Sequence, residues 1–273
     1  MKSAIIGLLA ETSIHPGTEQ STGAIDLPVA REAATGYPVL VGSSLKGALK
    51  DKAGQNSLDG VTKDEIFGKQ NNAGAVAVTD ARLLLLPVRS LTSHYKWVTC
   101  PYLLERFQRD RELAGLSASF AVPKPVKEEA IAAETPGNNQ LFLEELSFNV
   151  REAADEIAAV AEALAPLIKH RSARERLKQQ LVVLSDDEFK HFAMYGLQVN
   201  ARNQLDEDTK QSKNLWYEET LPPDTLLYAL LIPRSGKEPV LDHLKQLFNG
   251  HPYLQVGGNE TVGQGWCAVA WLG

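Results

Sequence analysis

Short apolar runs separated by polar or glycine-rich segments dominate the chain, and they predict buried strands alternating with helices. The clearest is Ala4 to Ala10, an uninterrupted apolar run that is typical of a strand buried on both faces. Residues 12–36, rich in Gly, Ser, Thr and Pro, follow as a long loop, and loops of that length inside a compact domain are usually functional. A strand-like run over 38–41 then leads into a helix for which Ser43 or Ser44 is the expected N-cap.

The rest of the chain continues this alternation, with two exceptions. Residues 115–140 have little periodicity and predict a mobile insertion, whereas residues 198–218 have two strand-like arms around a polar centre and predict a protruding β-hairpin. The other expected elements are two strands within 75–88, a helix over 101–113, a strand over 141–150, a helix over 152–168, a strand over 181–184, a helix from a Ser185 cap to Gly196, a strand over 225–232, a helix over 239–248 and a closing strand over 266–272. This succession predicts an α+β fold with one or two ferredoxin-like βαββαβ units, enlarged by the insertions.

Composition fits a globular protein and excludes several classes. At 273 residues, with 44% hydrophobic and 23% charged positions, the chain is neither collagen-like, nor a coiled coil, nor wholly disordered. Its apolar runs are too short to predict a signal peptide or a membrane span. Cys100 and Cys267 lie far apart without metal-binding spacing, so we expect a cytoplasmic protein without a zinc site.

The charge is unevenly distributed along the chain. The net charge of −6 speaks against nucleic acid as a partner, because phosphate binding is driven by Lys and Arg. Residues 40–127, however, hold 13 basic against 8 acidic side chains (+5), while residues 1–39 hold 2 against 4 (−2) and residues 128–273 hold 13 against 22 (−9). One segment could therefore face a polyanion while the remainder keeps the protein soluble.

Two glycine-containing segments are candidate phosphate-binding elements. The first opens a helix and contains Gly42, Ser43, Ser44, Lys46 and Lys50, whose free N–H groups and ammonium groups could hold a phosphate. It lacks the spacing of a Walker A loop, and an ordinary capped helix with solvated lysines is the alternative. The second segment runs between two strands and could bring backbone N–H groups close to a ligand, or could simply be a long hairpin turn; its candidate residues are Gly257, Gly258, Gly263 and Gly265.

The loop after the first strand brings an imidazole and a carboxylate together. His15 and Asp26 could both act on a ribose hydroxyl, since acid–base catalysis uses these groups. For any single loop His or Asp, a turn or cap role is the alternative.

Nine segments along almost the whole chain carry a specific pattern. They are His15 to Thr18, Gly23 to Pro28, Thr35 to Pro38, Gly42 to Lys50, Ala81 to Leu84, Pro87 to Leu91, Trp97 to Pro101, Leu221 to Tyr228 and Gly257 to Gly265. In this order they resemble the RAMP superfamily, and more narrowly the Cmr-type backbone subunits of type III-B CRISPR effector complexes. It is their collinear combination that is specific.

The resemblance implies an architecture and a set of partners. It implies a single domain over 1–273 with a modified ferredoxin-like palm, an active-site loop at 12–36 and a β-hairpin thumb at 198–218. Such subunits stack as copies of one another along a CRISPR guide RNA, assemble with other effector subunits, and cut guide-paired target single-stranded RNA at regular intervals. The Gly42 to Lys50 segment would hold the guide backbone.

The resemblance also implies catalytic residues. Asp26 matches the family's catalytic carboxylate, and His15, Glu218 and Glu219 match positions that support cleavage by a metal-assisted endoribonuclease. The expected cofactor is Mg²⁺ or Mn²⁺, with Asp26 as the candidate ligand. Thr220 departs from the pattern, because the family often has an aromatic residue there.

Three other functions remain open from the sequence. The chain could be a non-catalytic guide-coating subunit of the same complex, as its acidic balance and Thr220 suggest. It could be a guide-processing endonuclease of the same superfamily. It could also be a ferredoxin-like protein whose glycine-rich turns serve a ligand other than nucleic acid.

Overall fold

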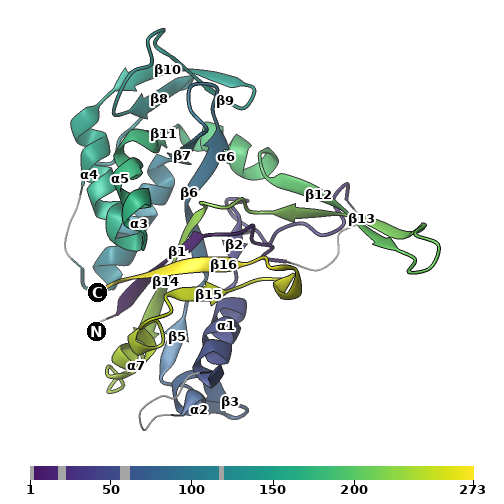
Figure 1. Ribbon diagram of the computed structural model, residues 1–273. Coiled ribbons are helices and arrows are strands. Elements are labelled where there is room, and N and C mark those ends of the chain that lie inside the picture. The colour runs from purple at the N-terminus through teal and green to yellow at the C-terminus, as the bar shows by residue number, and fades with distance from the viewer. Residues whose placement is uncertain (1–2, 18–22, 56–61, 117–119) are drawn as a thin grey trace.

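The centre of the molecule is a mixed sheet of twelve strands (Figure 1), in a computed structural model that describes residues 3–17, 23–55, 62–116 and 120–273. The strands are β1 (Ala4–Ala10), β2 (Val39–Leu40), β5 (Val76–Val78), β6 (Ala81–Arg89), β7 (Tyr95–Thr99), β8 (Glu129–Ala132), β9 (Gln140–Leu143), β10 (Leu146–Glu152), β11 (Leu181–Val183), β14 (Leu226–Pro233), β15 (Tyr253–Gln255) and β16 (Trp266–Leu272). Their order is β15-β16-β1-β14-β6-β7-β11-β8-β10-β9, with β2 beside β6 and β5 beside β14. Two pairs, β7–β11 and β8–β10, are parallel, and the others are antiparallel.

Strand β1 lies between β14 and β16, and every residue of it is buried. Its all-apolar sequence fits this position, because both faces of the strand are covered. One of those contacts requires Gly7, since a Cβ there would lie 2.1 Å from the carbonyl oxygen of Leu167 in the short helix that crosses the strand.

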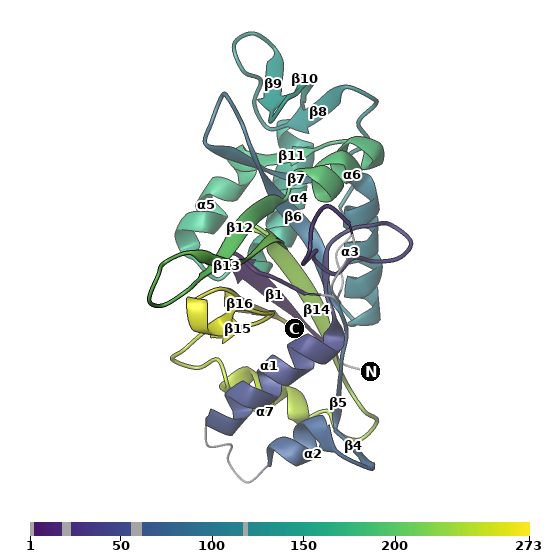
Figure 2. The ribbon, with the colours of Figure 1, turned by 90° about the vertical axis from the view of Figure 1, so that its right-hand side faces the viewer.

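The helices surround this sheet in two groups. Figure 1 places α3 to α5 beside the upper half, and both views place α1, α2 and α7 at the lower end, with α1 below β15 and β16 in Figure 2. No helix among the described residues is long and apolar enough to cross a bilayer. The helices are α1 (Gly42–Gln55), α2 (Lys63–Phe67), α3 (Pro101–Leu113), α4 (Ala154–Leu164), α5 (Arg171–Gln180), α6 (Asp186–Tyr195) and α7 (Val240–Gln246), with 3₁₀ turns at Ala165–Leu167 and Glu260–Val262.

Two hairpins stand apart from the main sheet. Strands β12 (Gln198–Leu205) and β13 (Ser212–Thr220) form a ribbon that projects from the body, as predicted (Figure 1). The second pair, β3 (Gly68–Lys69) and β4 (Asn72–Ala73), follows α2 at the lower end.

Three details differ from the sequence-based expectations. Helix α1 begins at Gly42, so neither Ser43 nor Ser44 is its N-cap; the carboxylate of Asp80 instead accepts the Gly42 N–H at 2.7 Å. Residues 115–140, of which 117–119 lie outside the described ranges, contain strand β8, which is held by pairing with β10 and β11. The single strand expected over 141–150 is the hairpin β9–β10, because Glu144 adopts a left-handed conformation (φ 49°) and reverses the chain.

Candidate functional site

The loop predicted to carry the chemistry lies against the base of the β12–β13 hairpin. Its residue Leu27 pairs in parallel with Glu218 of β13. The Leu27 N–H donates to the Tyr217 carbonyl at 3.0 Å, and the Glu219 N–H donates to the Leu27 carbonyl at 3.0 Å. A second bridge joins Ile14 to Leu221. The loop is therefore bonded to the hairpin base at two isolated bridges, and this brings His15, Asp26, Glu218 and Glu219 into one region.

Asp26 is the exposed member of this group. Its Oδ2 accepts the Tyr217 N–H at 2.8 Å, which fixes the carboxylate where the hairpin leaves the body. Its Oδ1 makes no hydrogen bond within the described part of the chain. Asp26 thus presents one oxygen to solvent or ligand from a fixed position.

His15 is buried beneath the loop. Its Nδ1 lies 2.8 Å from the Glu219 carbonyl oxygen, and because a carbonyl only accepts, Nδ1 carries the proton. In the neutral imidazole Nε2 is then unprotonated. A Cβ added at Gly17 would lie 2.9 Å from that Nε2, so the glycine leaves the space that the ring needs.

Glu219 uses both carboxylate oxygens to hold the loop. Oε2 accepts the Val29 N–H at 3.0 Å, and Oε1 pairs with the guanidinium of Arg31 at 2.6 Å. Arg31 also donates to the carbonyl oxygens of Ala193, at 2.7 Å, and Gly36, at 3.0 Å. Since Glu219 is 4% exposed and fully bonded, its side chain positions the loop and has no oxygen free for a substrate.

Glu218 connects the hairpin base to the glycine-rich loop. Its Oε1 accepts from Asn259 Nδ2 at 2.5 Å, and its Oε2 lies 3.5 Å from Arg202 Nε on β12. Asn259 also donates to the Gln264 side chain within the glycine-rich loop. Like its neighbour, Glu218 is 2% exposed and acts as a brace.

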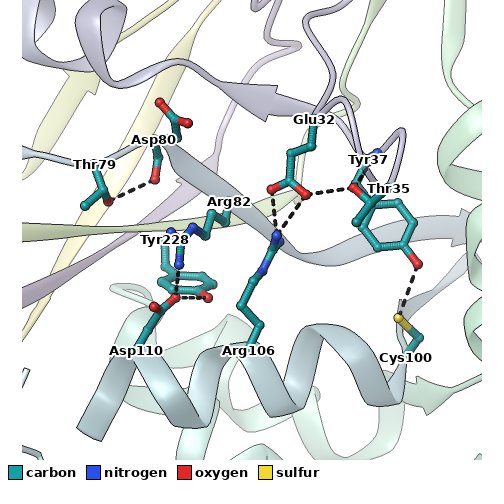
Figure 3. Close-up of polar contacts among 10 residues, drawn as sticks. All are labelled: Glu32, Thr35, Tyr37, Thr79, Asp80, Arg82, Cys100, Arg106, Asp110 and Tyr228. Atoms are coloured by element: carbon teal, nitrogen blue, oxygen red, sulfur yellow. Dashed lines mark hydrogen bonds and ion pairs between the residues drawn. The ribbon is translucent and has the colours of Figure 1, made fainter. Parts of the chain in front are cut away.

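The far end of the loop is fixed to helix α3 by partly buried polar contacts (Figure 3). Arg106 on α3 donates to both carboxylate oxygens of Glu32, at 2.6 and 2.8 Å. Thr35 donates to the same carboxylate, and the Tyr37 hydroxyl lies 3.8 Å from the Cys100 sulfur. Burial raises the pKa of the Tyr37 hydroxyl, so it stays protonated at neutral pH.

A second group in the same view ties the central strands to α3. Asp110 accepts from Arg82 on β6 and from the Tyr228 hydroxyl on β14, the latter at 2.6 Å (Figure 3). Burial and the Asp110 charge raise the pKa of Tyr228, which favours the protonated donor that this contact needs. Polar contacts of Asp110 thus join strands β6 and β14 of the sheet to helix α3.

The residues predicted to bind phosphate at the start of α1 do not form a helix N-terminus with free N–H groups. Besides the bond from its N–H to Asp80, Gly42 packs so tightly that a Cβ would lie 2.8 Å from the Val78 carbonyl. Lys50 pairs with Asp64 at 3.0 Å and donates to the Gly68 carbonyl at 2.9 Å. Ser43 and Lys46 lie on the side of α1, where they line a hollow beside β3 and β4.

The second glycine-rich segment packs against the loop that carries His15. The Gly258 N–H donates to the His15 carbonyl at 2.9 Å, and a Cβ at Gly257 would lie 2.6 Å from that oxygen. Gly265, with φ 85°, approaches the Val256 carbonyl so closely that a Cβ would lie 2.0 Å away. Gly263 has open space around it. Close backbone contacts therefore require glycine at two of these four positions, Gly257 and Gly265.

No three His, Cys, Asp or Glu side chains cluster at metal-binding distance in the described ranges. Asp26 stands as a single exposed carboxylate. A divalent ion at this position would take most of its ligands from phosphate oxygens and water, as Mg²⁺ commonly does.

Comparison with known proteins places the chain in a family. The sequence profile of the RAMP superfamily matches residues 8–268. The chain belongs to the RAMP superfamily.

Individual RAMP proteins resemble the chain over its full length. The CRISPR system Cmr endoribonuclease Cmr4 of Pyrococcus furiosus is 34% identical over 284 residues, which cover 98% of this chain and 95% of the relative. The crystal structure of oligomeric Cmr4 from Pyrococcus furiosus superposes with a TM-score of 0.80 at 32% identity, covering 99% of this chain and 98% of the other. A chain in the cryo-EM structure of the type III-B Cmr-β complex bound to cognate target RNA shares the fold, with a TM-score of 0.79 at 23% identity over 99% of this chain and 97% of that one.

The sequence analysis did not identify the residues that hold this candidate site together. Arg31 and Asn259 lie far in sequence from the glutamates that they bind, while Arg202 lies on the other arm of the predicted hairpin from Glu218. The one available signal is that two adjacent glutamates end a strand and must be neutralised once buried. Thr220, the departure from the family pattern, is fully buried and within 3.4 Å of Asn200 Nδ2.

Proposed function

We propose that this chain is the backbone subunit of a type III-B effector complex that cleaves guide-paired target RNA. The observation that carries the proposal is the exposed Asp26 carboxylate, fixed by the Tyr217 N–H at the base of a projecting hairpin. The full-length relative from Pyrococcus furiosus, named a Cmr endoribonuclease, supports it.

We infer that the lower part of the sheet is a ferredoxin-like palm. The strand order β16-β1-β14-β6 is antiparallel throughout, helix α1 lies between β1 and β6 in sequence, and α7 lies between β14 and β16. That succession corresponds to a βαββαβ unit, the arrangement of many RNA-binding domains. The β12–β13 hairpin would be its thumb.

The chemistry needs little more than positioning. In the proposed reaction the 2′-oxygen of a target ribose attacks the adjacent phosphorus and the bond to the 5′-oxygen breaks, which gives a 2′,3′-cyclic phosphate and a 5′-hydroxyl. One proton leaves the 2′-oxygen and one is added to the 5′-oxygen. Holding the nucleophile in line accounts for much of the rate enhancement in such reactions.

We assign the proton acceptor to Asp26. Its free oxygen faces outward beside the thumb, where a target nucleotide displaced by the hairpin would lie. Glu218 and Glu219 act as positioning residues, because their oxygens are bonded to Asn259, Arg202, Val29 and Arg31. His15 supports the same region through its bond to the Glu219 carbonyl.

For a divalent cation, this site offers a single protein ligand. Asp26 would contribute one carboxylate oxygen, and the remaining ligands of Mg²⁺ or Mn²⁺ would come from RNA phosphates and water. When bound, the ion would neutralise charge that develops on the phosphate. The binding partners that we propose are a CRISPR guide RNA, target RNA, further copies of this chain and other effector subunits.

The test uses assembled complex and an RNA target. We expect Asp26→Asn to bind target like the parent complex and to leave it intact, while Asp187→Asn, which changes an exposed aspartate on α6, cleaves normally. A target with a single 2′-deoxy nucleotide at the cut should also survive.

The same experiment decides the alternative of a guide-coating subunit without activity, which the buried Thr220 favours. Parent complex that binds target without cutting it would establish that alternative. Cleavage undiminished by Asp26→Asn would refute the assignment of Asp26.

A further inference from the structure

A hollow lies on the side of the molecule away from the projecting hairpin, where helix α7, the start of α5 and the end of β16 meet (Figure 1). Its volume is about 340 Å³, within the range of ~300–1,000 Å³ that small-ligand sites have. The floor of the hollow is apolar and includes the buried residues Ile168, Val269 and Ala270. None of its lining residues belongs to the candidate site around Asp26.

The walls of this hollow are fixed by packing against the sheet. The 3₁₀ turn Ala165–Leu167 crosses β1 at Gly7, the position where the Leu167 carbonyl leaves no room for a side chain. On the other side, the ring of Phe248 lies 6.3 Å from the ring of Trp271, at a tilt of 46°. The hollow is therefore formed by the fold itself, as small-ligand sites usually are.

Three exposed cations surround the hollow, and they come from distant parts of the chain: Lys169, Arg174 and Lys245. None of them forms an ion pair or a side-chain hydrogen bond with any residue that the structure describes. The described lining holds no aspartate or glutamate, although residues 128–273 have a net charge of −9. Because like charges held close together repel one another, the fold gains nothing from this arrangement, whereas a bound anion would neutralise it.

An indole ring and a side-chain amide add a second kind of recognition. Trp271 is half-buried in the lining, and an indole ring of this kind can stack on a nucleobase. The amide of Asn249, also in the lining, supplies both donors and an acceptor, which the polar edge of a base requires. Nucleotides combine a flat aromatic ring with several negative charges, and they match both features of the hollow.

An acidic peptide is the competing ligand, because its carboxylates would also meet the three cations. A carboxylate side chain brings a single charge into a hollow of this size, whereas a polyphosphate brings several charges within reach of Lys169, Arg174 and Lys245 together. Arginine binds phosphate through two parallel hydrogen bonds, and lysine adds a point charge. The convergence of three cations on one small volume beside an indole ring therefore favours a nucleotide.

We propose that this hollow binds a nucleoside polyphosphate, with the base against Trp271 and the phosphates among Lys169, Arg174 and Lys245. The site goes beyond the proposed function, because it faces away from the hairpin and shares no residue with the groups assigned to RNA binding or cleavage.

The test is isothermal titration calorimetry of the full chain with ATP, AMP and inorganic triphosphate at constant ionic strength. We expect ATP to bind at least about tenfold more tightly than the other two, because only ATP meets both the ring and all the cations. Trp271→Leu should weaken ATP binding about tenfold and leave triphosphate binding unchanged, whereas Lys245→Gln should weaken both by the same factor of about three to ten. Lys178→Gln is the matched control, since it changes an exposed lysine of α5 outside the hollow, and it should bind ATP like the parent.

Variants of the exposed cations keep the test decisive if Trp271→Leu fails to fold, since Trp271 also packs against the core. A parent chain that binds no ATP at about 1 mM, or ATP binding unchanged in both Lys245→Gln and Arg174→Gln, would overturn the site. Equal affinity of the parent for ATP and triphosphate would overturn the place given to the base. A hexaglutamate peptide that binds more tightly than ATP would overturn the nucleotide in favour of an acidic protein segment.

The outcome is separable from that of the proposed function. Asp26→Asn should bind ATP like the parent, because Asp26 is not part of the hollow. Loss of target cleavage in Asp26→Asn would support the proposed function whether or not the chain binds ATP.

Discussion

Removing the arginine from the pair of Arg31 and Glu219 should cost an unusually large amount of stability for a single ion pair. Its Nη2 to Oε1 distance is 2.6 Å, and the two side chains are 20% and 5% exposed. Arg31→Met keeps much of the apolar stem but leaves the Glu219 carboxylate with the Val29 N–H as its remaining described partner. The variant therefore leaves the Glu219 charge uncompensated, and it also removes the bonds from Arg31 to the carbonyl oxygens of Ala193 and Gly36.

The magnitude follows from the burial. Removing one partner of a buried pair costs about 3–5 kcal/mol, and partial solvent access to Arg31 reduces this to about 2–4 kcal/mol. At about 2–4 °C per kcal/mol for a domain of this size, the melting temperature should fall by about 4–16 °C. Arg89→Met is the matched control, because Arg89 pairs with Glu144 at 2.5 Å while 81% exposed, and a pair at the surface contributes about 0–1 kcal/mol.

The assay is urea denaturation followed by circular dichroism, with both variants and the parent at neutral pH. We expect a lower midpoint for Arg31→Met at an unchanged slope, and little change for Arg89→Met. Target cleavage should also fall in Arg31→Met at temperatures where it is folded, because a misplacement of about 1 Å can cost about 100-fold in rate. Equal stability of the two variants would refute the argument that Glu219 is a buried brace.

Two further predictions concern the glycine-rich loop and the hairpin tip. Gly263→Ala and Gly265→Ala both force alanine into a left-handed conformation, which costs about 1–2 kcal/mol each. In Gly265→Ala the added Cβ also clashes with the Val256 carbonyl, so thermal unfolding should show a further loss of at least about 1–3 kcal/mol. Equal losses of stability in the two variants would contradict this packing. At the tip, the Lys213 ammonium and the Thr209 and Asp208 N–H groups lower the pKa of Asp206 to about 2. The hydrogen bonds to Asp206 need its ionised carboxylate, so they are fully formed above the ordinary pKa of aspartate and are lost as the pH falls towards 2. The NMR shifts of the Asp208 and Thr209 amides should therefore titrate near pH 2 in the parent and nearer pH 4 in Lys213→Gln. A midpoint near pH 4 in the parent would contradict the contact between Lys213 and Asp206.

Local sequence signals predict the elements that local physics determines. The bounds of β1 coincide with the apolar run Ala4 to Ala10, and α3 spans Pro101–Leu113 because proline fits the first turn of a helix. Ser185 caps α6 as expected, accepting the Glu188 N–H. Helix α5 was not predicted from the sequence. It buries only Ala173 and Leu177, which are too few apolar positions to produce a periodic pattern.

Contacts between distant segments were beyond the reach of such signals. The carboxylate of Asp80 accepts the N–H of Gly42, and the two residues are 38 positions apart. The sequence next to helix α1 therefore gave no indication of this cap. Arg31 and Glu219 are separated by 188 positions, and neither residue type indicates the other. The resemblance to the family named His15, Asp26, Glu218 and Glu219 as candidates, but only the three-dimensional structure shows that Asp26 is exposed and that the other three are buried.

The position of β1 has a consequence for biosynthesis. This strand precedes both of its neighbours, which begin only at Leu226 and Trp266, so during translation it stays unpaired until those distant strands have been made. Folding that depends on such distant pairing is slow and exposes apolar edges to aggregation. Chaperone dependence in the cell, and better yield at reduced expression temperature, are therefore expected from the topology alone.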